Sequence, residues 1–375
     1  MEIQKLKKGE FIMSRPQIGT LEAIMLILSV VVTHTILTLP SDILTSMQSA
    51  SILNLIFVSV IAIIITYVIF RLFKNFPGLD IIDISELVGG KVLKNLIGTI
   101  FITYFLITSS MLLRNFCESI KIIYYPMTNI FFILAFFVIA VCMANRLEFS
   151  ATLKTNMIIL PIVLLSIIFL FFSNMNLFTP ERIFPILGDG LYNTFLLGLG
   201  NLYSFGGIAF LYLLPPLLKE PDKFKKISLI SIGVTALYLI LTIATLLFMF
   251  SFFVTTNEIT PLYNATRYIE FGTFFQRLES VFLLIWILAF ACYLSIVSKF
   301  SMGIFKKLTK IETKKPLIDI FGLLILAISL IPRNYAMSQN FESNIYPLLV
   351  IGIVFFMGLS LLILANLKRR KESKI

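Results

Sequence analysis

One apolar stretch, Leu191–Leu218, limits what this chain can fold into. It reads LYNTFLLGLGNLYSFGGIAFLYLLPPLL and is long enough to cross a bilayer, which takes about 20 apolar residues. Glycines interrupt it and two prolines close it, at Gly198, Gly200, Gly206, Gly207, Pro215 and Pro216. Because unpaired backbone groups are costly in lipid, a broken helix persists only where protein buries it or where it lines a cavity. We therefore expect residues 201–207 to be unwound and to face a small ligand, although glycines can also serve close helix packing.

The composition places the whole chain in a membrane. Hydrophobic residues make up 58% of the 375 residues, charged residues only 14%, and the mean hydropathy is +0.96. A soluble chain carries about 25% charged residues. Residues 1–17 are polar and basic, without an apolar core or a small-residue cleavage site, so we expect no cleaved signal peptide. The candidate spans are 18–39, 52–73, 96–116, 129–144, 157–172, 191–214, 227–254, 278–297, 317–331 and 345–367.

The basic residues predict the topology, because cytoplasmic loops collect Lys and Arg. If both termini are cytoplasmic, 25 of the 31 Lys and Arg residues fall in inner segments and six in outer ones. The inner set includes the N-terminal segment 1–17, the loop around 299–315 and the basic tail 368–375. Topology and contacts with anionic membrane lipids thus explain the net charge of +11, and we expect no nucleic-acid partner.

Ten spans divide into two halves of five, 18–172 and 191–367, within a single permease-like transmembrane domain. An odd number of spans reverses orientation, so the halves would be inverted repeats in which the first and sixth spans correspond. The first span carries the polar run Thr33-His34-Thr35 in its middle, and Pro40 is expected to end it. Both corresponding spans are therefore interrupted, which predicts a ligand site at the midplane between the halves.

Two groups of motifs resemble the GerAB-type spore germination permease family. The first is FPILGDG at 184–190, followed by YSFGG at 203–207 and LLP at 213–215. The second is FFQRLES at 274–280, followed by Trp286. The resemblance extends over nearly the whole chain. It implies an all-α integral membrane protein of the amino acid–polyamine–organocation superfamily, with a LeuT-like five-plus-five inverted repeat of ten helices in which helices one and six are broken.

The resemblance also implies a role and partners. Members of the family are B subunits of nutrient germinant receptors in the spore inner membrane, where they detect a small nutrient, often an amino acid. They act with an A-type membrane subunit and a C-type lipoprotein subunit to trigger germination. Two alternatives share the fold: an ion- or proton-coupled permease for amino acids or organic cations, and a conduit for water or ions.

Three spans supply the candidate ligand-binding residues. They are Thr33, His34 and Thr35 in the first span, Tyr104 and Ser109 in the third, and Asn201, Tyr203, Ser204, Phe205, Gly206 and Gly207 in the sixth. An unwound sixth span would offer backbone amides and a helix N-terminus to a carboxylate. Each residue type also has a structural alternative, because hydroxyls bond back to the preceding turn, aromatic rings pack in the core, and a lone histidine hydrogen-bonds a carbonyl.

Arg277 and Glu279 open the eighth span, and Trp286 lies seven residues beyond Glu279. Ionisable residues at membrane depth are functional candidates by default. Because these two lie near the predicted outer surface, we expect the three residues to form a gate or a subunit contact rather than to bind the ligand.

What the sequence lacks also limits the function. Its three cysteines lie within or beside apolar spans, and we expect them to pack there. No metal-ligand spacing and no nucleophile–base motif is present, so we expect no metal, no cofactor and no enzymatic activity. No Asp or Glu falls in the middle of any proposed span, which argues against a carboxylate proton relay or a sodium site.

Overall fold

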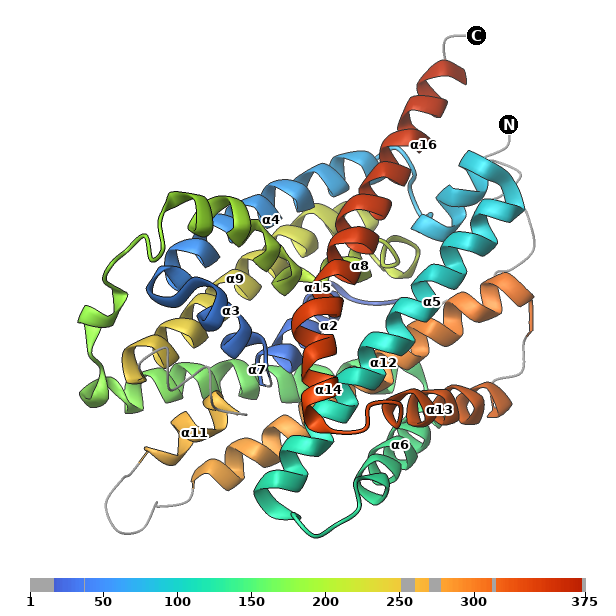
Figure 1. Ribbon diagram of the computed structural model, residues 1–375. Helices are drawn as coiled ribbons and strands as arrows, with labels where there is room; N and C mark the ends of the chain where they lie inside the picture. The colour runs from blue at the N-terminus through green and yellow to red at the C-terminus, as the bar shows by residue number, and fades with distance from the viewer. Residues whose placement is uncertain (1–16, 37, 251–259, 270–277, 312–314, 373–375) are drawn as a thin grey trace.

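The computed structural model describes residues 17–36, 38–250, 260–269, 278–311 and 315–372, and this part of the chain is almost wholly helical (Figure 1). The α-helices are α2 (Thr20–Thr35), α3 (Leu39–Met47), α4 (Ser51–Phe73), α5 (Ile81–Tyr124), α6 (Ile130–Arg146), α7 (Phe149–Ser173), α8 (Ile208–Leu211), α9 (Phe224–Met249), α11 (Pro261–Arg267), α12 (Leu278–Thr309), α13 (Lys315–Ser329), α14 (Tyr335–Asn340), α15 (Tyr346–Leu349) and α16 (Gly358–Glu372).

The other helical segments of the described residues are π-helices and 3₁₀ helices. The π-helices are η4 (Tyr192–Leu196), η8 (Phe341–Ile345) and η9 (Val350–Met357). The 3₁₀ helices are η1 (Gln48–Ala50), η2 (Met175–Leu177), η3 (Pro180–Ile183), η5 (Leu197–Phe205), η6 (Pro215–Leu217) and η7 (Pro221–Lys223).

Six helical units of the described chain are long and apolar enough to cross a membrane: 39–73, 81–124, 149–173, 221–249, 278–309 and 335–371. Helices α2 and α6 are apolar but shorter. Over its described residues, each apolar run of the sequence coincides with helical structure. The all-α membrane architecture is thus confirmed, whereas the count of ten spans and the boundaries of the two halves stay predictions.

The first span is interrupted later than the sequence suggested. Thr33-His34-Thr35 is the regular last turn of α2, and the helix stops at Ile36. Pro40 does not end the span, because it stands in the first turn of α3, which continues to Met47. Proline is favourable there, since the first turn of a helix leaves its backbone N–H groups without intrahelical acceptors. The first span is therefore two helices, and its second part contains Asp42.

The sixth span is irregular, but the prediction of an unwound segment at 201–207 was wrong. Asn201 to Phe205 belong to the 3₁₀ helix η5. Gly206 (φ −54°, ψ −21°) and Gly207 (φ −56°, ψ −20°) keep right-handed helical dihedral angles. A Cβ on Gly207 would lie 3.0 Å from the carbonyl oxygen of Ile27. Residues 201–205 are therefore wound more tightly than an α-helix and are not unwound. Because Gly207 has no side chain, α2 can pack closely against it, a role that glycine often has in membrane proteins.

Helix α2 is the centre of the bundle. It packs against α7, α9 and α12, and nearly all its side chains are buried. Helix α4 packs on α9 and η5, while α5 packs on α12, α13 and α16 (Figure 1). Large apolar side chains on the outer helices stay exposed, among them Phe132, Phe136, Ile158, Leu165 and Leu323. Such a surface is suited to lipid tails.

The two interrupted spans are joined at one end of the bundle. Ile18, just before α2, donates to the carbonyl of Leu217 (2.7 Å) and accepts from the backbone N–H of Lys219 (3.0 Å). In Figure 1 the end of α16 lies at the top of the view, and α11 lies at the lower left. Helix α5 bends at Gly89–Gly90, where Gly90 has φ +68°, a value that favours glycine. The bend separates a short helix, 81–88, from the long one.

Lys307 at the same end is part of an ion cluster, not only a topology determinant. Its Nζ lies 2.6 Å from Oδ1 of Asp80 and 2.6 Å from Oδ2 of Asp83, and all three side chains are largely buried. Asp80 also caps α5 by accepting from the N–H of Asp83. The cluster therefore holds the start of α5 against the end of α12.

We expect Lys307→Gln to lower the free energy of unfolding by about 1.5–3 kcal/mol, the usual contribution of hydrogen bonds to charged groups. Thermal unfolding of the purified protein in detergent measures this. Lys310→Gln is the matched control, because Lys310 is exposed, and it should change stability by no more than about 0.5 kcal/mol. Equal effects of the two substitutions would show that the cluster does not hold α5.

Candidate functional site

A buried carboxylate lies where α2, α5 and η8 meet. Glu342 is 4% exposed, and its Oε1 lies 3.3 Å from Nδ1 of His34. Its Oε2 accepts from Nδ2 of Asn115, a fully buried residue of α5. His34 is thus hydrogen-bonded to a carboxylate rather than to a neighbouring carbonyl. The three residues form the polar centre of the bundle, and a polar group this deep persists only when it is hydrogen-bonded.

Proline explains how Glu342 reaches the interior. Pro347 has no N–H to donate to the carbonyl of Ser343, and its ring crowds that carbonyl in a regular helix. The chain widens here into the π-helix η8, Phe341–Ile345, before α15 begins. π-Helical turns are rare and frequently occur at functional sites. The widened turn carries both Glu342 and Ser343.

The expectation that no Asp or Glu lies in the middle of a span stays a prediction, because Asp42 and Glu342 lie near the starts of the apolar units 39–73 and 335–371. Asp42 of α3 accepts a hydrogen bond from Oγ of Ser343 (2.7 Å) and lies within electrostatic range of Glu342. Both residues lie outside the predicted spans, which run from 18 to 39 and from 345 to 367. The segment LPSDILTSM is amphipathic and has a proline at its second position, where a helix tolerates it. This pattern could have predicted a helix that contains Asp42.

Four tyrosines enclose this polar centre. Tyr346 stacks on the imidazole of His34, with ring centroids 4.7 Å apart and 13° between the planes. Tyr293 and Tyr203 stand edge-on to this pair, at 6.2 Å from His34 and 5.9 Å from Tyr346. The Tyr104 hydroxyl lies close to Tyr346. Of these residues the sequence singled out His34, Tyr104 and Tyr203, and it missed Tyr346 and Tyr293.

The site is closed in this structure. The space between His34, Thr108, Met111, Leu112, Phe341, Glu342 and Tyr346 amounts to about 160 Å³, and no part of it is wide enough for a water molecule. A Cβ on Gly206 would lie 2.7 Å from the Tyr346 hydroxyl. The side chain of Tyr346 therefore occupies the place beside Gly206 where a ligand was expected.

Several predicted site residues make structural contacts instead. Thr33 and Ser109 hydrogen-bond back to carbonyls of their own helices, at Ser29 (2.6 Å) and Leu106 (3.2 Å). Thr35 does so too and also lies 3.1 Å from the Tyr238 hydroxyl of α9. The bonds of Thr33 and Ser109 stay within their own helices, whereas the Thr35–Tyr238 contact joins α2 to α9.

Some of the predicted sixth-span residues make packing contacts, and others lie beside the polar centre. Asn201 donates to Oδ1 of Asn54 (2.8 Å) and so ties η5 to α4. Phe205 is fully buried. Tyr203 and Ser204 are buried with hydroxyl groups that have no partner. Of this set, Tyr203 and Gly206 face the polar centre through their contacts with Tyr346.

The predicted gate is only partly described. Arg277 and the motif residues 274–276 lie outside the described residues. Glu279 is half-buried in the first turn of α12, and Trp286 is 1% exposed and packs edge-on against Phe282. Trp286 thus lies inside the bundle, and a gating role for Glu279 and Trp286 stays a prediction.

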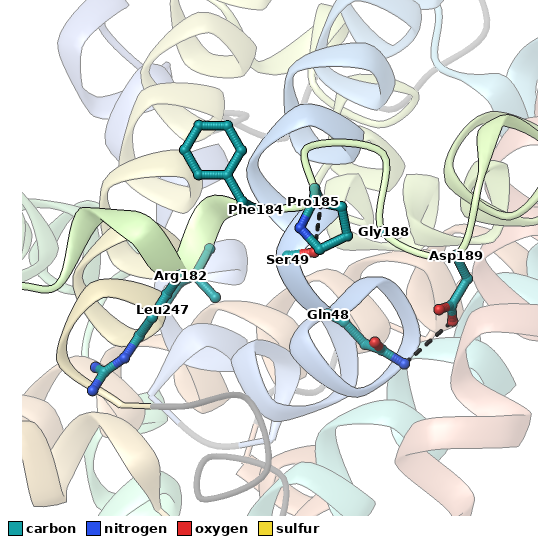
Figure 2. Close-up of a pocket in the computed structure, with 8 residues that line it drawn as sticks. All are labelled: Gln48, Ser49, Arg182, Phe184, Pro185, Gly188, Asp189 and Leu247. Carbon is teal, nitrogen blue, oxygen red and sulfur yellow. Dashed lines mark hydrogen bonds between the residues drawn. The ribbon is translucent and has the colours of Figure 1, made fainter.

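A second cavity, of about 270 Å³, opens beside η1 (Figure 2). It is lined by Gln48, Ser49, Arg182, Phe184, Pro185, Gly188, Asp189 and Leu247. Gln48 donates to Asp189 (3.2 Å), Ser49 donates to the carbonyl of Pro185 (2.7 Å), and Arg182 donates to the carbonyl of Phe248 (2.7 Å). The FPILGDG motif therefore attaches the segment before the sixth span to the end of the first.

Within the described residues, no group of three His, Cys, Asp or Glu side chains is placed to hold a metal ion. The polar centre is best suited to a small organic ligand, because it combines hydrogen-bonding groups with aromatic walls.

Comparisons with known proteins show the family to which the chain belongs. A family model described as spore germination protein matches residues 17–338. The chain is 24% identical over 367 residues to spore germination protein YndE of Bacillus subtilis (strain 168), covering 96% of this chain and 98% of that protein. It is 26% identical over 227 residues to spore germination protein GerQB of Bacillus cereus (60% and 61% covered) and 23% identical over 337 residues to spore germination protein KB of Bacillus subtilis (84% and 86% covered).

Among solved structures, the substrate-bound outward-open state of a Na⁺-coupled sialic acid symporter matches with a TM-score of 0.65. The match covers 92% of this chain and 80% of the symporter at 10% sequence identity. A likeness at that identity speaks for the fold alone, and it confirms the LeuT-like transporter fold that the sequence predicted.

Proposed function

Because the chain belongs to the spore germination protein family, we propose that it is the B-type membrane subunit of a nutrient germinant receptor. In this role it binds a small nutrient, for which an amino acid is the first choice, at the polar centre between α2, α5 and η8. It then triggers germination together with an A-type membrane subunit and a C-type lipoprotein subunit. We place it in the spore inner membrane with both termini in the cytoplasm.

One observation carries the proposal. His34 in the last turn of α2 meets Glu342 of η8, which also contacts Asn115 of α5, within a ring of tyrosines and close to Gly206 of the sixth span. Transporters of this fold bind their substrates near the midplane beside interrupted helices. The spore germination relatives supply the biological setting of the ligand.

An ion- or proton-coupled permease is the second candidate, and a specific observation favours it. Glu342 and Asp42 are ionisable residues in the interior of a membrane protein, where such residues often belong to ion or proton pathways. The Na⁺-coupled symporter with the same fold shows that the architecture is compatible with coupling in another protein.

Reconstituted vesicles separate the two candidates. The purified chain is offered labelled amino acids, and binding and trapped uptake are recorded together, with and without gradients of Na⁺ and H⁺. Saturable binding without accumulation supports the receptor subunit, and gradient-driven accumulation supports the permease. A chain that binds no solute, alone or with its partner subunits, would overturn both.

A further inference from the structure

We propose that Glu342 and Asp42 form an ammonium-binding subsite, so that the nutrient of this protein carries a positively charged nitrogen. The inference rests on the proposed function, because it assigns the charge of the ligand that the polar centre takes.

The charge balance of the polar centre is the first reason. Glu342 and Asp42 contribute two carboxylates, and among the described residues no Lys or Arg side chain pairs with either of them. Arg114, on the same helix as Asn115, is committed to Glu118. The single imidazole of His34 contacts Glu342 but cannot neutralise both carboxylates. Buried carboxylates call for a cation, and here the ligand would supply it.

Unpaired acceptors are the second reason, and they point to the same chemistry. Oδ2 of Asp42 and Oδ1 of Asn115 are both buried and receive no hydrogen bond from any residue that the structure describes. Asn115 is fully buried, and its Nδ2 already donates to Glu342. Since carboxylate and amide oxygens only accept, the missing group is a donor. An ammonium group brings three N–H donors and a positive charge.

The surrounding rings are the third reason. Tyr346, Tyr203 and Tyr293 stand around His34 and Glu342. The hydroxyl of Tyr203 is buried and has no hydrogen-bond partner among the described residues. The faces of aromatic rings attract cations, so this enclosure favours an alkylammonium group over an anion.

Matched compounds test the charge requirement directly. The purified full chain is titrated by calorimetry with alanine, valine and phenylalanine, with their decarboxylated amines (ethylamine, isobutylamine and phenethylamine) and with their deaminated acids (propionate, isovalerate and hydrocinnamate). Glucose and uridine serve as neutral solutes, and NaCl is titrated against a choline background. We expect at least one amino acid or its amine to bind and none of the deaminated acids to do so.

Two substitutions then locate the subsite. Glu342→Gln and Asp42→Asn keep the shape of each side chain and remove its charge. We expect Glu342→Gln to weaken binding of the ammonium compound by about thirtyfold or more, as loss of one member of a buried charge pair does, and Asp42→Asn to weaken it in the same direction. Asp319→Asn is the control, because Asp319 is an exposed acid on α13 and should leave affinity unchanged. Unfolding temperatures of all variants confirm that they are folded.

The outcomes distinguish the two levels of inference. Binding of a deaminated acid or a neutral solute, but of no ammonium compound, overturns the subsite and leaves the proposed function in place. The same holds if a folded Glu342→Gln protein binds the ammonium compound with wild-type affinity, or if Na⁺ alone binds in a Glu342-dependent manner. Failure of every compound to bind overturns the proposed function and the subsite with it.

Discussion

Arg114→Met is expected to lower the free energy of unfolding by about 3–5 kcal/mol, because it leaves a buried carboxylate without its cation. The Arg114 and Glu118 side chains are 4% and 9% exposed, with Nη2 2.8 Å from Oε1. Arg114 also donates to the carbonyl of Ser329 and so links α5 to α13. Chemical denaturation of the purified protein in detergent measures the effect.

Two further variants show whether burial is the cause. The double variant Arg114→Met/Glu118→Leu should recover most of the lost stability, since replacing both members of a buried pair with apolar side chains is often nearly neutral. Arg146→Met removes the same cation from a pair with Asp319 whose side chains are 62% and 55% exposed, and it should cost no more than about 1 kcal/mol. Equal losses for Arg114→Met and Arg146→Met would contradict the expectation.

Gly206→Ala and Gly200→Ala are expected to change stability in opposite directions, although both residues lie in or next to η5. A Cβ on Gly206 would lie 2.7 Å from the Tyr346 hydroxyl, whose ring is held between His34 and Tyr203. Overpacking of this kind costs about 1–3 kcal/mol. A Cβ on Gly200 has no atom within 4 Å, so alanine there should stabilise by about 0.4–1 kcal/mol. Thermal unfolding measures both changes.

A second substitution tests whether the contact with the Tyr346 hydroxyl causes the effect of Gly206→Ala. Tyr346→Phe removes the hydroxyl that a Cβ on Gly206 would meet, so Gly206→Ala should cost less in a Tyr346→Phe background than in the wild-type protein. The double-mutant cycle gives this coupling energy, which we expect to be at least about 0.5 kcal/mol in the compensating direction. A cycle without coupling would mean that Gly206→Ala acts elsewhere than on Tyr346.

Long apolar segments predicted the membrane class and the helical runs, and the resemblance to the spore germination permease family implied the fold. The sequence also predicted that the first and sixth spans are irregular. It erred where a boundary depended on a single proline. Pro40 was taken as the end of a span, and Pro347 was not considered as the cause of a widened turn. Proline stops one helix and starts another, and only packing decides which.

The wrong boundaries at these two prolines also explain why only part of the polar centre was predicted. His34 was identified because it is the single histidine of the chain and lies in an apolar run. Its partner Glu342 lies more than 300 positions later and three residues before the predicted start of the last span, so spacing alone could not connect the two. Gly206 was identified because it lacks a side chain. In this structure the Tyr346 hydroxyl, not a ligand, occupies the space beside it.

The position of Trp286 gives the protein a built-in optical reporter. It is the single tryptophan of the chain, it is 1% exposed, and its indole Nε1 is buried without a hydrogen-bond partner. Intrinsic tryptophan emission therefore comes from one point on α12, the helix that packs against α2, α5 and α7. Any movement that admits water around this helix will shift the emission to longer wavelength, without a label and without a change to the chain.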